Sequence, residues 1–516
     1  MPVNHPSWLS ARSALAAVAA AVAVSVSHAQ QPADTAPHYV IRGRQVQVRQ
    51  RELIARIERF REVLGAALRR DAPEWLARME PPPSIVTGYQ LLPRIVPDAA
   101  PAETSFALQT VSYSWAWSET LIQGETEKLS SLEAALSRVA HQPPRPLLDS
   151  IVTEYRKLLD RKKRVDADVD YNWLWQAAVA RSPAPFDRAT SLSTALLQLQ
   201  SQRRSLDGER DGTARAKLAD TIAARSAEVD RGLANDIKRT SIPGFVRFTR
   251  TSHGWIVTVP IVTDIQDSAF LAEFTRAVEP TWRAMSDDVA YAVRLDIKTI
   301  SPRALYCGPV SRASPPATAC APPARGATID LQAHIARFPP DGAVLTTGAG
   351  STHVTAGRAI VISPHDTPRR LLAHEFGHLL GFRDAYLRGR RDAGAGGYII
   401  TELVVDQSDI MGNSKTGMVR ASHFERLLAV KDLPALMRAG LSALYERHDP
   451  TAAVTRFRDV LERDPQHYGA TVQLAKALDA SGKAAEASEW WTRVLALAQE
   501  AGDSATIREA RARIRG

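Results

Sequence analysis

The chain has 516 residues, with 65 Lys and Arg against 56 Asp and Glu, a formal net charge of +9 and only two cysteines. This length exceeds what one hydrophobic core supports, so we expect several domains. The basic excess is spread along the sequence. A specific nucleic-acid binder usually has its basic residues clustered with aromatic residues on one face, so the charge pattern argues against that class.

The first 29 residues are typical of an export signal. Arg12 precedes an apolar, alanine-rich run over residues 13–26, and Ser27-His28-Ala29 offers small residues for cleavage. The run is shorter than the roughly 20 residues that span a bilayer, and no later stretch is apolar enough to do so. We therefore expect an exported protein, periplasmic or extracellular, without a transmembrane span. An uncleaved membrane anchor is the alternative.

Residues 30–240 are predicted to be helical. Apolar residues recur at helical spacing in several stretches, which proline-rich breaks separate. These stretches include residues 52–69, 119–139, 147–159 and 214–234. A helical region in front of an exported domain can be an accessory domain or a removable propeptide, and both interpretations stay open.

The pattern changes near Phe245 to that of an α/β domain, which we predict over residues 241–430. Residues 268–285 have helical spacing, with Asp267 in position to cap that helix. Cys307 and Cys320 flank a loop rich in Pro, Ser and Ala, and in an exported protein we expect them to form a disulfide. Strands are predicted from β-branched or alternating runs at residues 254–262, 289–300, 343–347 and 358–363.

The segment from Leu371 to Asp384 carries a metal-ligand pattern. His374 and His378 are four residues apart, so on a helix both imidazoles lie on one face and can bind one ion. Glu375 is placed to act as the general base toward a water on that ion. Gly381 fits the end of the helix, and Asp384 can supply the third ligand from the returning loop.

Two other residues are candidates for the third ligand. Glu402 lies downstream at a distance that resembles the glutamate ligand of thermolysin-like peptidases, and His423 is a second possibility. The thermolysin-like class does not need Gly381 or Met411, and a lone histidine at the start of a helix is more often a cap neighbour or a surface residue, so Asp384 is favoured. The intervening residues 388–398 are rich in Arg and Gly, which predicts a basic loop.

The pattern His374-Glu375-x-x-His378-x-x-Gly381-x-x-Asp384 resembles the metzincin zinc peptidases, and its aspartate is similar to the snapalysin type. The family also has a methionine turn below the zinc, and Met411, followed by Gly-Asn, is the candidate. The resemblance implies a Zn²⁺ cofactor and a mixed sheet under the active-site helix. It also implies a peptide or protein substrate that lies along an edge strand.

Residues 431–516 contain an internal repeat. Its apolar positions Ala453, Phe457 and Val460 recur about 34 residues later as Ala487, Trp491 and Val494. Period and pattern resemble tetratricopeptide repeats, with a degenerate opening helix over residues 433–444 and a capping helix over residues 503–515. Two repeats are few, so this unit is expected to dock on the catalytic domain or to bind a partner protein.

Together these patterns predict a multidomain α and α/β protein. It would have a helical N-terminal region, a metzincin-like α/β catalytic domain and C-terminal helical hairpins. The predicted function is that of an exported zinc-dependent endopeptidase with Glu375 as general base. The alternative is an envelope protein-binding scaffold with an idle peptidase domain, against which the intact Glu375 argues.

Overall fold

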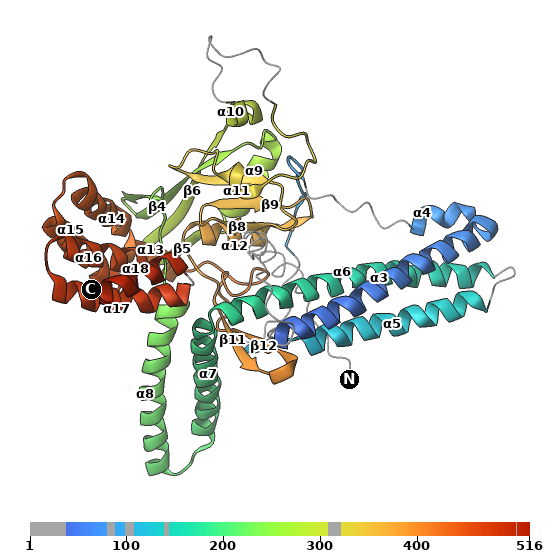
Figure 1. The fold of residues 1–516 in the computed structure, drawn as a ribbon, viewed down its shortest axis with the longest axis horizontal. Coiled ribbons are helices and arrows are strands. Elements are labelled where there is room, and N and C mark those ends of the chain that lie inside the picture. The colour runs from blue at the N-terminus through green and yellow to red at the C-terminus, as the bar shows by residue number, and fades with distance from the viewer. Residues whose placement is uncertain are drawn as a thin grey trace, which may run out of the picture. The chain divides into compact units, whose positions relative to one another are not determined.

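A computed structural model describes residues 38–79, 88–98, 108–138, 144–307, 321–501 and 503–515 (Figure 1). The predicted export signal and Cys320 lie outside the described residues, so the predicted disulfide stays a prediction. The chain divides into two compact units. The first draws on residues 1–86, 111–180 and 390–401, and the second on residues 87–110, 181–389 and 402–516.

The first unit is built on three long helices, α3 (His38–Asp71), α5 (Trp115–Ser137) and α6 (Arg145–Arg181). Two short helices, η3 (Pro73–Trp75) and α4 (Leu76–Met79), follow α3. Along α3, Leu53, Ile57, Phe60 and Leu64 are at most 3% exposed. This spacing of three or four residues makes a continuous apolar stripe, so the helices pack along their lengths. The predicted helical character of this region is confirmed.

The second unit contains a seven-stranded sheet with the order β5-β6-β4-β7-β9-β8, and β3 pairs with β4 outside this path. The strands are β3 (Arg247–Thr251), β4 (Gly254–Thr263), β5 (Arg283–Ser286), β6 (Val289–Thr299), β7 (Ala343–Thr347), β8 (His353–Thr355) and β9 (Ala359–Ile362). The pairs β4–β6, β4–β7 and β7–β9 are parallel, whereas β3, β5 and β8 pair antiparallel. Strand β8 is therefore an antiparallel edge strand.

Both faces of this sheet are covered. Leu345 and Ile360 belong to the main core, together with residues of α9 (Ser268–Val278) and α12 (Arg369–Leu379). The neighbouring Val344 and Val361 belong to a second cluster with residues of α10 (Pro302–Cys307) and α11 (Leu331–Ile335). Successive side chains of a strand point to opposite faces, so each central strand feeds both clusters.

Helix α9 begins as predicted but ends earlier. Asp267 Oδ1 accepts a hydrogen bond from the Phe270 N–H at 3.0 Å, which caps the helix. The helix ends at Val278, and residues of the predicted helical stretch form β5 instead. Glu279 still has helical dihedrals, with φ −61° and ψ −42°, but Pro280 has no N–H to continue the hydrogen-bond ladder, which accounts for the end of the helix.

The hairpin of α7 (Ala184–Gly208) and α8 (Gly212–Asp236) belongs to the second unit. The two helices run side by side in Figure 1. Ala189 on α7 and Leu233 on α8 are part of the main core, as is Phe424 on α13 (Ala421–Val430). The unit boundaries therefore cut across the predicted boundaries at 240 and 430, because apolar residues on both sides share one core.

The C-terminal part is a series of helices packed around its own core. They are α14 (Leu433–Leu441), η5 (Ser442–Glu446), α15 (Pro450–Arg463), α16 (Tyr468–Ala480), α17 (Ala484–Ala501) and α18 (Ser504–Arg515). The repeated positions Phe457, Val460, Trp491 and Val494 are all fully buried. The predicted hairpins are therefore present, each with its repeated apolar residues facing inward.

Two smaller sheets complete the fold. β1 (Ile95–Val96) pairs with β10 (Thr367–Pro368), and a second sheet has the order β11-β12-β2. Its strands are β11 (Tyr386–Asp392), β12 (Tyr398–Val404) and β2 (Gln109–Tyr113), with η4 (Gly394–Gly396) between β11 and β12. The prediction of a loop over residues 388–398 was wrong. Leu387 and Gly389 are buried in alternation with more exposed neighbours, as in a strand. The strand is held by pairing with β12, which the composition of the segment does not indicate.

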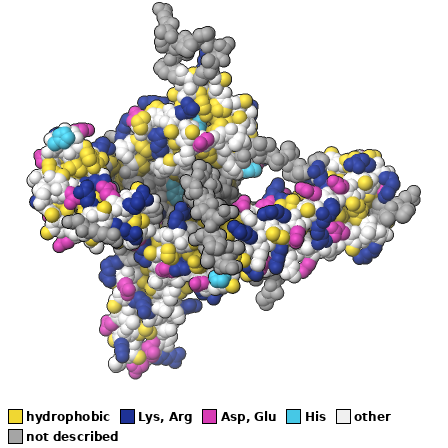
Figure 2. Space-filling model, viewed as in Figure 1, with side chains coloured by type: hydrophobic (Ala, Val, Ile, Leu, Met, Phe, Trp, Pro, Cys, Tyr) yellow, Lys and Arg dark blue, Asp and Glu magenta, His cyan; other side chains and the backbone are white. Residues whose placement is uncertain are grey.

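On the face shown in Figure 2, basic and acidic side chains are interspersed over the described surface. Several arginines are paired with acids, as in Arg56–Glu133 and Arg78–Asp149. Among the described residues, no helix combines the length and the apolar character that crossing a bilayer requires.

Candidate metal centre

Helix α12 carries the histidine motif and is held on several sides. Leu372, Phe376 and Leu379 are fully buried in the main core. The helix ends in a Schellman motif, in which the Phe382 N–H binds the Gly377 carbonyl at 3.1 Å and the Gly381 N–H binds the His378 carbonyl at 3.0 Å. Gly381 has φ +91°, and a Cβ there would overlap the Ser241 carbonyl. The sequence expectation for Gly381 thus has a steric reason.

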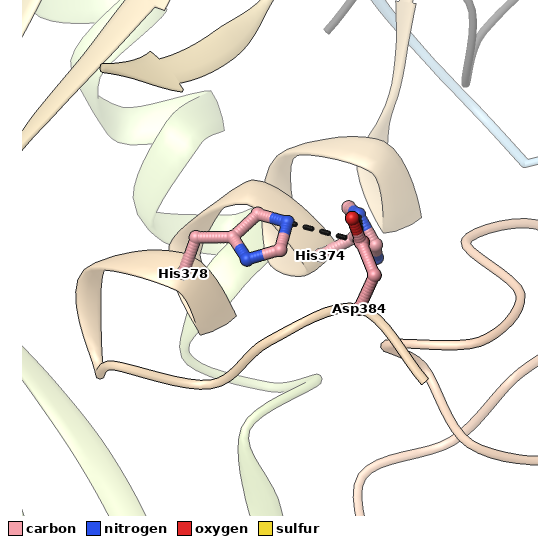
Figure 3. Close-up of side chains that lie close together, drawn as sticks. All are labelled: His374, His378 and Asp384. Atoms are coloured by element: carbon pink, nitrogen blue, oxygen red, sulfur yellow. Dashed lines mark ion pairs between the residues drawn. The ribbon is translucent and has the colours of Figure 1, made fainter. Parts of the chain in front are cut away.

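His374, His378 and Asp384 converge at one point (Figure 3). Each contributes a ligand atom, and these atoms lie within 4.8 Å of one another. Asp384 Oδ1 is 3.4 Å from His374 Nε2 and 3.3 Å from His378 Nε2. Two imidazole nitrogens and a carboxylate oxygen form a donor set that suits Zn²⁺ and leaves a fourth position for water.

A backbone carbonyl binds the Nδ1 atom of each imidazole and so sets the orientation of the ring. His374 Nδ1 donates to the Ile410 carbonyl at 2.9 Å, and His378 Nδ1 donates to the Phe382 carbonyl at 2.9 Å. A carbonyl only accepts, so each Nδ1 carries a proton and each Nε2 is the ring nitrogen that faces Asp384. Such backbone contacts commonly fix metal-binding histidines.

The charges of the three side chains are coupled. Burial lowers the pKa of His378, but the Asp384 carboxylate raises it more, to about 9. Burial also lowers the pKa of His374, and Asp384 again outweighs this effect. Burial raises the pKa of Asp384, yet the two histidines bring it well below its usual range. The site therefore favours positive charge next to a fixed carboxylate.

Glu375 is almost fully buried, at 1% exposure. Its Oε2 accepts a hydrogen bond from the Val354 N–H on the edge strand β8 at 3.1 Å. Its Oε1 is buried and has no hydrogen-bond partner among the described residues. Burial raises the pKa of Glu375, although His374 and His378 oppose the shift. One oxygen of Glu375 is thus anchored to β8, whereas the other makes no hydrogen bond within the described part of the chain.

Met411 packs beneath the helix. It is 1% exposed, and a Cβ on Gly377 would overlap its sulfur. The Met411 carbonyl accepts from the Ala385 N–H at 3.0 Å, directly after Asp384. The preceding Ile410 carbonyl holds His374. The turn around Met411 therefore contacts the segments that carry two of the three candidate ligands.

The other two ligand candidates are engaged elsewhere. Glu402 Oε1 accepts from Arg388 Nε at 2.7 Å. His423 uses both ring nitrogens, accepting from the Arg420 N–H and contacting Asp409 Oδ1, each at 3.1 Å. Within the described part of the chain, the group of His374, His378 and Asp384 is the one cluster of three or more such side chains able to hold a metal.

Tyr386 and Arg388 were missed by the sequence analysis. The Tyr386 hydroxyl donates to Asp384 Oδ2 at 2.6 Å, and Arg388 Nη2 donates to that hydroxyl at 3.1 Å. Burial, followed by Asp384, raises the pKa of Tyr386 well above its usual value. The available signal was the i, i+2 spacing of Asp384, Tyr386 and Arg388, which puts their side chains on one face of an extended segment.

Comparison with known proteins identifies one part of the chain. Residues 444–514 match the tetratricopeptide repeat family. This stretch is a tetratricopeptide-like repeat domain. It confirms the repeat predicted from the spacing of Phe457 and Trp491, and such a domain suggests interaction between proteins. No curated protein and no solved structure shows significant similarity to the chain.

Proposed function

We propose that the protein is an exported zinc-dependent endopeptidase of the metzincin type. The observation that carries this proposal is the convergence of three donor atoms beside Glu375, whose Oε1 is buried without a hydrogen-bond partner among the described residues. Metals and catalytic bases are found where buried ionisable groups are held in such an arrangement.

His374, His378 and Asp384 would hold the metal. A bound Zn²⁺ ion would polarise a carbonyl oxygen and lower the pKa of its water toward about 7. Glu375 Oε1 accepts the proton of the attacking water and passes it to the leaving amine, while its Oε2 stays bound to the Val354 N–H. The raised pKa of Glu375 suits this exchange, because the group must take up a proton and release it again.

Hydrolysis of casein by the full chain tests the proposal. We expect activity that 1,10-phenanthroline abolishes and that added Zn²⁺ restores. Glu375→Gln should lower kcat/KM by about 100-fold or more while zinc stays bound, because only the base is lost. Glu489→Gln, an exposed glutamate of the repeat domain, is the matched control and should act like the wild type.

The second candidate is an envelope scaffold whose repeat domain binds a partner protein while the metal site is idle. The match of residues 444–514 to tetratricopeptide repeats favours it. A chain that holds one zinc ion per molecule but cleaves neither casein nor a peptide library would support the scaffold and refute the peptidase. The scaffold is refuted if Glu375→Gln removes a measurable hydrolytic activity.

A further inference from the structure

A short segment far upstream in the sequence, residues 88–98, packs within the second unit and is called the strap here. The Tyr89 N–H binds the Ala327 carbonyl at 2.9 Å, and the Gly326 N–H binds the Tyr89 carbonyl at 2.8 Å. The Gln90 N–H donates to Thr347 Oγ1 at 2.7 Å. Backbone groups of the strap are thus satisfied by residues of the α/β part.

The first end of the strap covers a buried carboxylate. Asp264, directly after β4, is fully buried, accepts from Thr346 Oγ1 at 2.8 Å and lies 3.3 Å from His334 Nε2. Tyr89 is 1% exposed, and its ring centroid lies 5.4 Å from that of His334. Burial, then Asp264, raise the pKa of Tyr89, as expected for a buried hydroxyl near an acid. Removing Tyr89 would open this polar network to water.

The other end of the strap leads to helix α12. Ile95 and Val96 pair in parallel with Thr367 and Pro368, the two residues that precede the helix. Pro368 is at the N-cap position and makes no side-chain cap. Asp98 takes over this role, because its Oδ1 accepts from the Arg370 N–H at 2.8 Å across 272 residues of sequence. A carboxylate at this end also stabilises the helix dipole.

Arg370 extends the connection to the methionine turn. Its Nε lies 3.5 Å from Asp98 Oδ2, and its Nη1 donates to the Gly417 carbonyl at 2.7 Å. The neighbouring Met418 forms a bridge with Asp409, two residues before Met411. The strap, the first turn of α12 and the turn below the site are therefore joined through Arg370.

We propose that the strap is a permanent part of the active enzyme and that Asp98 is a positioning residue for the zinc-binding helix. The upstream region is then not a propeptide whose removal through residue 240 yields the active form, since the strap would leave with it. This inference rests on the proposed function only in that α12 binds zinc. Zinc binding and amide exchange report on the strap even if no substrate is cleaved.

The test compares Asp98→Ala with Asp98→Asn in the full chain. Asp98→Ala should weaken zinc affinity about fivefold and lower kcat about fivefold, while KM stays within about twofold of the wild type. The reason is that losing the cap loosens helix α12 and leaves the substrate contacts in place. The Arg370 amide should exchange faster. Asp98→Asn keeps an acceptor oxygen, so its zinc affinity and kcat should be close to those of the wild type. Arg94→Ala, whose exposed partner is Asp366, is the control within the strap.

Wild-type zinc affinity and Arg370 amide exchange in Asp98→Ala would overturn the role of Asp98. Mass spectrometry of the zinc-loaded wild-type protein tests the strap without any variant and so covers the case in which Asp98→Ala does not fold. We expect peptides from residues 88–98 in every zinc-loaded form that cleaves casein. A zinc-loaded form that lacks these residues and cleaves casein refutes the proposal, whereas one that retains them and stays inactive counts against the peptidase function alone.

Discussion

The Tyr386 hydroxyl donates to Asp384 Oδ2 at 2.6 Å, while Asp384 Oδ1 faces His374 and His378. The two oxygens of the candidate third ligand thus have separate tasks. Arg388 lies 5.0 Å from the centroid of the Tyr386 ring and binds Glu402 through Nε. A chain of side chains from β11 and β12 therefore sets the orientation of the Asp384 carboxylate.

Tyr386→Phe should weaken zinc affinity by about tenfold, the lower end of the range for lost partners of metal ligands. The carboxylate would lose the donor that fixes its orientation, whereas the phenyl ring would still fill the space. Competition with a chelating dye measures the affinity. Tyr445→Phe, which removes an exposed hydroxyl bound to Gln473, is the control. Equal zinc affinity in both variants would show that Tyr386 does not orient Asp384.

Asp384→Ala should release most of the bound zinc and leave the fold largely intact. The two histidines would remain, but a site with two protein ligands holds zinc poorly. Glu402→Ala should keep the metal, although it removes the carboxylate that Arg388 Nε contacts at 2.7 Å. Metal analysis after gel filtration separates the two variants. The assignment of the third ligand is wrong if Glu402→Ala empties the site while Asp384→Ala stays loaded.

Gly377→Ala should destabilise the protein by about 1–3 kcal/mol, the usual cost of overpacking a core. A Cβ there would overlap Met411 Sδ and lie 3.0 Å from Trp282 Cζ2. The helical Gly124 has nothing within 4 Å of a Cβ, so Gly124→Ala should be neutral or stabilising by up to about 1 kcal/mol. Thermal unfolding compares the variants, and a Gly377→Ala protein as stable as Gly124→Ala would contradict the close packing of Met411.

The sequence was sufficient where the structure depends on local spacing. The helical period places His374 and His378 on one face, and Gly381 ends the helix because of its own backbone conformation. Tyr386 and Arg388 were missed because their roles depend on a strand pairing that the Arg- and Gly-rich composition concealed. Asp98 was out of reach for a different reason. Nothing near residue 98 indicates a contact with Arg370, 272 residues later.

The boundaries of the two compact units also depend on contacts between residues that are distant in the sequence. Composition separates a helical region from an α/β region near Phe245, but Ala189 and Leu233 on the helical side share the main core with Phe376. Periodicity gives the type of each element and not the surface against which its apolar face packs. The predicted mixed α and α/β architecture is therefore correct, while its division into units follows contacts that the linear pattern does not contain.

Stability should fall at acid pH through Asp409. Burial raises the pKa of this carboxyl, but the hydrogen bond from His423 and then the His423 charge outweigh it, so its pKa lies below the usual value. The unfolded value is about 3.9, so the stabilising contribution is fully present above about pH 4 and is lost as pH falls through the lower, folded value.

Thermal midpoints measured from pH 6 down to pH 3 test this dependence. Asp409→Asn should be less stable than the wild type above about pH 4, and the difference should shrink below it, because the wild-type carboxyl then protonates too. Asp341→Asn, an exposed aspartate, is the control and should follow the wild-type curve. Wild-type and Asp409→Asn midpoints that fall in parallel over the whole range would exclude this origin of the pH dependence.

The repeat domain is held to the rest of the second unit by a pair that is largely buried. Arg239 Nη2 lies 3.0 Å from Asp464 Oδ2, with side chains 21% and 11% exposed. Arg239→Ala should cost about 1–3 kcal/mol, because the carboxylate stays buried without its partner. Arg458→Ala should cost about 1 kcal/mol at most, since that arginine and its partner Glu486 are 48% and 34% exposed. Amide exchange should rise in α15 and α16 for Arg239→Ala alone, and equal effects of the two variants would mean that this pair does not dock the repeats.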